Sequence, residues 1–124
     1  MKTNKILIIL LSFTFIICSC DKKAVHEYFM KNNCEETIIV EILDYHNKFS
    51  SIEIIPSVEK LVYYGETINS VYEDEITYFI KDIKIKKGDV MLNKNLLDYT
   101  IWHYEQITQF KAKSYMVIYP EDFE

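Results

Sequence analysis

The sequence predicts an all-β fold, an antiparallel β-sandwich of immunoglobulin-like or similar type. Short stretches rich in β-branched and aromatic residues recur along the chain, and several alternate apolar and polar positions with a period of two. Polar turns separate these stretches, and few patterns typical of helix caps occur between them. Many short strands joined by turns are typical of two packed sheets, so we expect a sandwich.

The first twenty residues have the layout of a secretory signal. Two lysines precede an apolar run from Ile6 to Ile17, and Ser19-Cys20 closes it. The run is shorter than the roughly 20 residues that a transmembrane helix needs. We therefore interpret it as an export signal that is cleaved rather than as a permanent span.

The pair Ser19-Cys20 resembles the lipobox of bacterial lipoproteins, in which signal peptidase II cuts before a cysteine that then carries acyl chains, palmitate among them. The resemblance implies a signal peptide over residues 1–19, a lipidated Cys20 with a short tether over residues 20–24, and one β-sandwich domain over residues 25–124. Two or three acyl chains on one cysteine hold a protein at a membrane effectively permanently. The alternatives are an uncleaved signal anchor and cleavage by ordinary signal peptidase at a nearby small residue.

Three strands are predicted in the first half of the domain. Residues 37–43 are β-branched or apolar on both alternations except at Glu41, which predicts a central strand covered on both faces. Residues 51–55 form a second predicted strand, which Pro56 ends because proline has no N–H for the ladder. Residues 59–64 form a third predicted strand, which Gly65 ends.

The clearest hairpin lies in the second half of the chain. Residues 83–86 alternate apolar and polar side chains, Lys87-Gly88-Asp89 supplies a glycine turn, and residues 90–92 return as an apolar strand. Two further strands are predicted near the end of the chain, with a turn before the second: residues 99–104, a turn over residues 111–113, and residues 114–119.

The segment from Ile68 to Ile83 fits two kinds of structure. Its apolar residues fall mostly at spacings of three and four, which would form one stripe on a helix. The same segment contains the alternation Ile76, Tyr78 and Ile80 among other β-forming residues. We expect strands here, with the helix as the alternative.

Charge and cysteine content limit the kinds of partner. The chain has 14 basic residues, all of them lysine, against 19 acids, and its net charge is −5. Nucleic-acid binding needs clustered cations and favours arginine, so no nucleic-acid partner is expected. With Cys20 acylated, Cys34 has no partner in the mature chain and no disulfide forms within it. We expect Cys34 to be a small buried apolar residue, with a reactive or intermolecular thiol as the alternative.

Five segments spread over the mature chain resemble one group of bacterial proteins: Cys20-Asp21-Lys22-Lys23, Asn32-Asn33, residues 69–78, residues 95–100 and residues 115–123. The chain is similar there to small exported lipoproteins of Bacteroidales and related bacteria. The resemblance implies a compact β-sandwich on a lipid anchor and brings no catalytic residues. Surface lipoproteins of that group usually carry several acids after the cysteine, whereas here only Asp21 precedes Lys22-Lys23. We therefore favour the periplasmic face of the outer membrane over the cell surface.

No motif for catalysis or metal binding stands out. The three histidines lie far apart and match no metal-binding spacing, so we expect neither a metal site nor another cofactor. Asp44, His46 and a serine at position 50 or 51 supply the residue types of a triad but no Gly-x-Ser-x-Gly elbow. The acidic residues 73–75 lack the pattern of a calcium loop and are interpreted as a solvated turn.

Aromatic residues are the unusual feature of the composition, at 15% of the chain. Tyr99, Trp102 and Tyr104 lie close together in the sequence and are the candidate ligand-binding residues. Exposed aromatic rings form good platforms for sugar rings or partner proteins, because they present apolar area with a polar edge. The alternative is that these rings fill the core of the sandwich and its rim.

We expect a lipid-anchored protein of the cell envelope that acts as a non-enzymatic binding or interaction module. Its expected partners are the membrane, through the acyl chains on Cys20, and another envelope protein. The alternative is a glycan-binding accessory lipoprotein for nutrient capture or adhesion that uses Tyr99, Trp102 and Tyr104. An enzyme such as a hydrolase is a third, weaker hypothesis.

Overall fold

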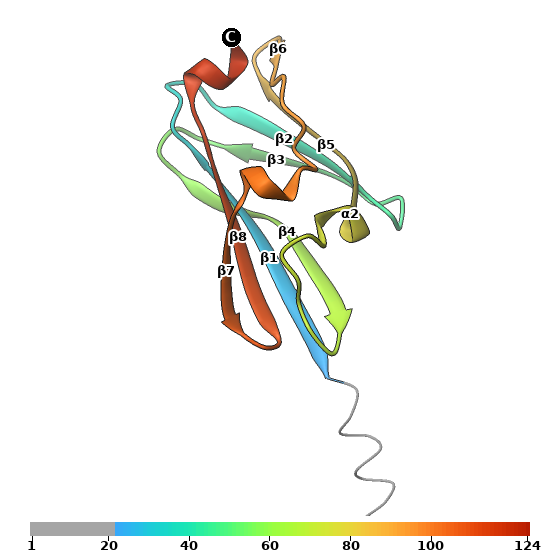
Figure 1. The fold of residues 1–124 in the computed structure, drawn as a ribbon. Helices are drawn as coiled ribbons and strands as arrows, with labels where there is room; N and C mark the ends of the chain where they lie inside the picture. Colours follow the sequence, from blue (N-terminus) through green and yellow to red (C-terminus); the bar gives the residue numbers. More distant parts are fainter. Residues whose placement is uncertain (1–21) are drawn as a thin grey trace, which may run out of the picture.

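A computed structural model describes residues 22–124, which fold into two four-stranded β-sheets packed face to face (Figure 1). Sheet A has the strand order β4-β1-β8-β7, and sheet B has the order β3-β2-β5-β6. The prediction of an all-β sandwich is confirmed. The elements are β1 (Lys23–Asn32), β2 (Ile38–Asp44), β3 (Phe49–Ile54), β4 (Glu59–Ile68), α2 (Ile76–Phe79), β5 (Ile80–Lys87), β6 (Val90–Met91), the 3-10 turn η1 (Tyr99–Ile101), β7 (His103–Thr108), β8 (Lys111–Ile118) and the 3-10 turn η2 (Pro120–Phe123).

Strand β1 lies inside sheet A and organises it. It pairs antiparallel with β4, where Lys23 lies opposite Ile68, and parallel with β8, where Asn32 lies opposite Ile118. The other pairs are antiparallel, so β1 and β8 are the one parallel pair among the described strands. The predicted tether is too long, because residues 23 and 24 already belong to the sheet and Ala24 is fully buried.

Strand β2 is an inner strand of sheet B, as its apolar sequence predicted. Ile38, Val40 and Ile42 face the core and are at most 1% exposed. Ile39 and Leu43 lie on the opposite face, where they are only half-buried. The expected cover on both faces is therefore wrong, because one side of sheet B is open to solvent.

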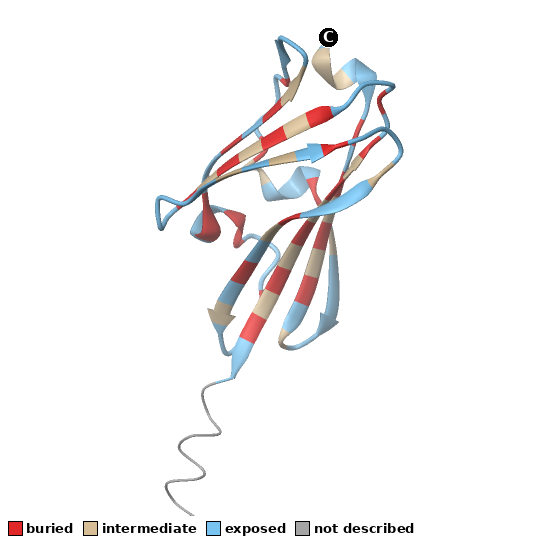
Figure 2. Cartoon of the chain, turned by 180° about the vertical axis from the view of Figure 1, so that it is seen from behind, coloured by how far each residue is buried: buried red, intermediate tan, exposed pale blue. Residues whose placement is uncertain are grey.

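The core changes character along the length of sheet A. Where the two sheets overlap, large apolar side chains such as Met30, Ile42 and Ile118 fill the space between them. Towards the start of β1, Ala24 and Ala112 pack instead against Val71 from the connection between β4 and α2. Figure 2 shows the buried stripe of β1 running through both regions.

Several strands begin or end at other residues than the sequence predicted. Strand β4 continues through Gly65 to Ile68 because Gly65 is paired with His26 in the ladder. The predicted strand over residues 99–104 begins as the turn η1, where the Asp98 carboxylate accepts the backbone N–H of Thr100 at 3.0 Å. Residues 111–113 belong to β8 rather than to a turn, which lies at residues 109–110.

The ambiguous segment combines the two expected structures. Residues 69–75 form an irregular connection that crosses from sheet A to sheet B, and the single turn α2 follows. Strand β5 then begins at Ile80. The expectation of strands is therefore right for Ile68, which ends β4, and for residues 80–83 in β5. It is wrong for residues 76–79, where Ile76 and Phe79 are buried from a helical turn.

Gly65 offers a test of the packing between α2 and sheet A. A Cβ at this position would lie 2.8 Å from three carbons of the Phe79 ring. We expect Gly65→Ala to lower the free energy of unfolding by about 1–3 kcal/mol through overpacking, measured by urea unfolding. The loss should shrink when the substitution is made in Phe79→Leu, and equal losses in both backgrounds would contradict this account.

Candidate functional site

A cluster of buried polar side chains lies between the two regions of the core. His26 on β1 is fully buried, and its Nδ1 lies 2.8 Å from Oε1 of Glu75. Its Nε2 lies 2.7 Å from Oγ of Ser114 on β8. The hydroxyl oxygen of Tyr28 lies 3.2 Å from Nδ1, so all four residues meet at one imidazole.

The carboxylate of Glu75 determines the tautomer of His26. A carboxylate can only accept, so Nδ1 carries a proton and donates it to Glu75. Nε2 then accepts the O–H of Ser114 when the ring is neutral, and donates to Oγ when the ring is protonated. The cluster thus satisfies the imidazole in either state, and no described buried side-chain N or O atom lacks a partner.

The arrangement has the order of a Ser-His-carboxylate triad, but it is sealed. Ser114 and Glu75 are each 2% exposed, and His26 is 0% exposed. A nucleophile needs an open space where a substrate carbonyl can approach, together with donors for the developing oxyanion. None of these three residues lines a described pocket. The buried cluster joins β1, β8 and the connection before α2.

Local sequence patterns contain little sign of this cluster. Its members are separated by 49 and 88 positions, so no short motif contains them. His26 interrupts the apolar pattern of β1, and Ser114 that of β8, so sequence periodicity does not predict β1. The available signal was the alternation of Ala24, His26, Tyr28 and Met30, which all face the core.

The expected aromatic platform does not exist, because Trp102 is buried. Its ring is 4% exposed, its indole N–H donates to the carbonyl of Leu96 at 2.9 Å, and its centroid lies 5.4 Å from that of Tyr28. Tyr104 is half-buried, with its ring 5.6 Å from His26. Tyr99 is exposed on η1. Two of the three candidate rings therefore pack around the His26 cluster and do not share an exposed patch with Tyr99.

Asp44, His46 and Cys34, the other residues that the sequence singled out, lie at a turn or in the core. Asp44 Oδ1 accepts the backbone N–H groups of His46 and Lys48, each at 2.9 Å, and so stabilises the turn between β2 and β3. The imidazole of His46 is exposed at that turn, so these residues form no triad. Cys34 is a buried core residue, as expected, and burial raises the pKa of its thiol.

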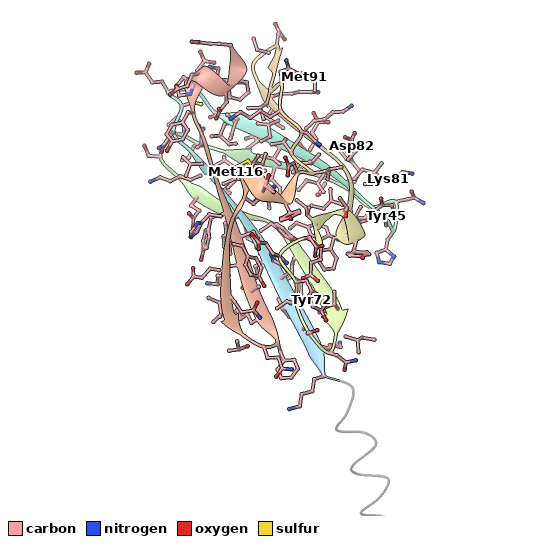
Figure 3. All side chains as sticks on the ribbon, in the orientation of Figure 1. Tyr45, Tyr72, Lys81, Asp82, Met91 and Met116 are labelled. Carbon is pink, nitrogen blue, oxygen red and sulfur yellow. The ribbon has the colours of Figure 1, made fainter. Side chains whose placement is uncertain are left out.

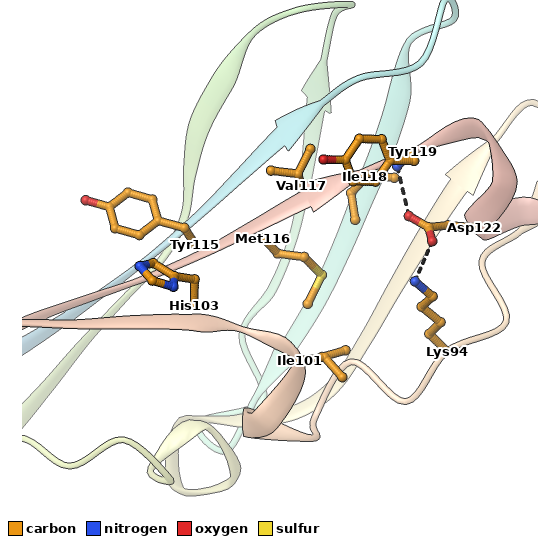
Figure 4. A pocket seen from close by; sticks show the side chains of 9 residues that line it. All are labelled: Lys94, Ile101, His103, Tyr115, Met116, Val117, Ile118, Tyr119 and Asp122. Atoms are coloured by element: carbon orange, nitrogen blue, oxygen red, sulfur yellow. Dashed lines mark hydrogen bonds and ion pairs between the residues drawn. The ribbon is translucent and has the colours of Figure 1, made fainter.

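An open groove lies beside β8 on the side that faces β7 (Figure 4). Its volume is about 380 Å³, and its apolar lining includes Ile101, Tyr115, Met116 and Tyr119. An ion pair between Lys94 and Asp122 lies at one end. Ile101 and Tyr119 are 41% and 44% exposed, so the lining is accessible to a partner.

The groove exposes part of the edge of sheet A. Strand β7 pairs with β8 only as far as His103 opposite Tyr115. The carbonyls of Phe110 and Ile118 accept N–H groups from the β1 side, so the backbone groups of Val117 point to the opposite side, into the groove. No described strand pairs with Val117 there. A peptide in extended conformation would find one N–H and one C=O to bond.

The described residues contain no group of three or more His, Cys, Asp or Glu side chains placed to hold a metal ion. None of the helices in the same part of the chain is long and apolar enough to cross a membrane. The predicted signal peptide and Cys20 lie outside the described residues. Comparisons with protein-family models, curated proteins and solved structures found no match.

The Glu75 carboxylate provides a test of the buried cluster. We expect Glu75→Ala to lower the free energy of unfolding by about 3–5 kcal/mol, because it leaves buried His26 without its acceptor. Glu75→Gln should lose less, since an amide oxygen still accepts. Asp82→Ala, which breaks the exposed pair with Lys84, is the control and should change stability by no more than about 0.5 kcal/mol. A loss from Glu75→Ala as small as the control would contradict the structural role.

Tyr28 provides a test at alkaline pH. Burial raises the pKa of Tyr28 well above its ordinary value, and the charge of Glu75 raises it further. As pH rises, the unfolded chain therefore releases the Tyr28 proton before the folded chain does. The contribution of protonated Tyr28 to the free energy of unfolding is fully present below about pH 10 and is lost as pH rises above it. In urea unfolding above about pH 10, wild type should lose stability more steeply than Tyr28→Phe, by up to about 1.4 kcal/mol per pH unit. Tyr78→Phe, at a position that is 75% exposed, should keep the wild-type slope, and equal slopes in all three would refute the assignment.

Proposed function

We propose that the chain is a lipid-anchored, non-enzymatic binding module of the cell envelope whose partner is another envelope protein. The observation that carries the proposal is the groove beside β8, where an accessible apolar lining meets the unpaired edge of Val117. Backbone groups at an open edge bind extended peptides, and neighbouring side-chain pockets give selectivity. A protein segment therefore suits this groove.

The buried state of the His26 cluster supports a role without catalysis. Its serine has triad-like hydrogen bonds but is 2% exposed, so it offers a substrate no approach. The exposed surface instead carries scattered aromatic side chains, among them Tyr45 and Tyr72, which are 57% and 61% exposed and are labelled in Figure 3. We do not propose glycan capture through Tyr99, Trp102 and Tyr104, because Trp102 is part of the core.

The proposed location is the outer membrane, with the periplasmic face favoured over the cell surface. It rests on the signal-like sequence before Cys20 and on the two lysines that follow Asp21. The described sandwich begins at β1, three residues after Cys20. An acylated Cys20 would therefore hold the domain directly at the membrane surface.

A crosslinking experiment tests the groove. A photoreactive amino acid at position 101 or 119 should form an adduct with one partner protein in living cells, because both positions line the groove. The same amino acid at position 45, which is 57% exposed on the turn after β2, is the matched control and should not form that adduct. Equal yields at all three positions, or no adduct at the groove, would argue against the site.

The anchor is tested separately with Cys20→Ala. We expect wild type to incorporate a labelled palmitate analogue and to fractionate with membranes, whereas Cys20→Ala should lose both properties. Protease treatment of intact and lysed cells then reports the membrane face: protection until lysis supports the periplasmic face. Unchanged labelling in Cys20→Ala would rule out this cysteine as the acylation site.

A further inference from the structure

One end of the sandwich gathers three chain segments into a single surface. Strand β1 begins there, β4 ends there at Ile68, and the turn between β7 and β8 lies beside them (Figure 1). The carbonyl of Lys22 accepts the N–H of Asn69 at 2.8 Å, and the carbonyl of Phe110 accepts the N–H of Val25 at 2.8 Å. We call this surface the basal tip, made of Lys22, Lys23, Ile68, Ile107 and Phe110.

The basal tip presents apolar side chains to the outside. Ile68 is 67% exposed and Ile107 is 44% exposed. Ile107 occupies an irregularity in the pairing of β7 with β8, between Gln106 and Thr108. Phe110 is half-buried, and the Lys22 ammonium lies 5.1 Å from its ring centroid. Lysine beside exposed apolar groups is typical of surfaces that enter the headgroup region of a bilayer.

The charge of the domain is distributed along its long axis. Residues 67–70 and 107–110, the two segments at the tip, contain no carboxylate, and Lys22, Lys23 and Lys111 surround them. Lys23 and Lys111 have ion pairs with Glu66 and Glu27, at 3.8 and 3.5 Å, but both ammonium groups remain accessible. The opposite end carries six acids in its loops and in η2: Glu35, Glu36, Asp89, Glu121, Asp122 and Glu124. Two lysines lie among them, Lys94 paired with Asp122 and Lys87 beside Glu35 and Glu36, so acids outnumber lysines there. An anionic bilayer would attract the first end and repel the second.

The chain also leaves the described sandwich at this end. Lys22 is the first described residue, and in the sequence only Asp21 separates it from Cys20, after the apolar run from Ile6 to Ile17. A membrane anchor in that region, either acyl chains or an uncleaved apolar segment, lies within a few residues of the tip. Extended chain spans at most about 3.6 Å per residue, so such an anchor would hold the tip next to the bilayer.

We propose that the basal tip docks on the phospholipid bilayer, with Ile68, Ile107 and Phe110 among the headgroups and the acidic end pointing away. This orientation rests on the proposed anchor for its location, but the affinity of the tip for lipid is a separate property. It leaves the groove beside β8 free, because the groove's Tyr119 and Asp122 lie towards the acidic end.

The experiment uses residues 21–124 without acyl chains, since all described strands pair within residues 23–118. Flotation with vesicles of phosphatidylethanolamine and phosphatidylglycerol measures partitioning. The double variant Ile68→Asn/Ile107→Asn should bind at least about tenfold more weakly than wild type. The matched control is Ile55→Asn/Val90→Asn, which removes two similarly exposed apolar side chains near the other end and should bind like wild type.

A second measurement uses the full acylated chain in the same vesicles. An environment-sensitive fluorophore on Ile107→Cys should shift its emission to shorter wavelength on reconstitution, and one on Ile55→Cys should not. The native Cys34 is buried and does not compete for the label.

The outcomes separate the two proposals. Absence of vesicle binding by wild type, equal losses in the tip and control variants, or equal emission shifts at positions 55 and 107 would overturn docking while leaving acylation of Cys20 untouched. A change of oligomeric state in the tip variant, without a change in vesicle binding, would assign the tip to contact between two copies and would also overturn it. Vesicle binding that depends on the tip supports docking even if Cys20→Ala leaves acylation unchanged.

Discussion

The burial of one face of β1 is the constraint on which the rest of the structure depends. Five alternate residues of this strand, Ala24, His26, Tyr28, Met30 and Asn32, are at most 1% exposed. His26, Asn32 and the hydroxyl of Tyr28 need hydrogen-bond partners, because a buried polar group without a hydrogen bond is costly. His26 obtains them from Glu75 and Ser114, and Asn32 donates to the carbonyls of Glu36 and Ile54 at 2.8 Å. These bonds determine how β8, β3 and the connection before α2 lie around β1.

The polar cluster and the aromatic rings around it form one unit. The imidazole of His26 stacks on Tyr28 at 4.2 Å between centroids, and Trp102 meets Tyr28 edge to face at 5.4 Å. These rings form a surrounding of low dielectric constant, which strengthens the hydrogen bonds inside the cluster. It also increases the free-energy cost of losing one of them. The hydrogen-bonding order is that of a hydrolytic triad, but in this chain it lies in the interior and joins β1, β8 and the connection before α2.

The two ends of the domain differ, which would not be so in a sandwich of two sheets of equal length. Sheet A extends beyond sheet B, and at its far end Val71, from the connection after β4, packs against Ala24 and Ala112. That end carries Lys22, Lys23 and Lys111 together with the exposed Ile68 and Ile107, whereas the acidic loops and the groove beside Val117 lie further along β8. A molecule built in this way can turn one end towards a bilayer and offer a different surface to a protein partner.

The sequence alone determined the fold class, the inner strand β2 and the hairpin of β5 and β6, because their β-branched alternation and glycine turn are local signals. It also identified Cys34 as a buried residue. Only the tertiary structure decided that β1 exists as a central strand, since its inward positions are partly polar and become stable only through partners 49 and 88 positions away. The same long-range packing buried Trp102 and turned residues 76–79 into a helical turn, against their local preference. Periodicity reports which side of a strand is apolar, whereas a buried hydrogen-bond network depends on contacts that arise only when the chain closes on itself.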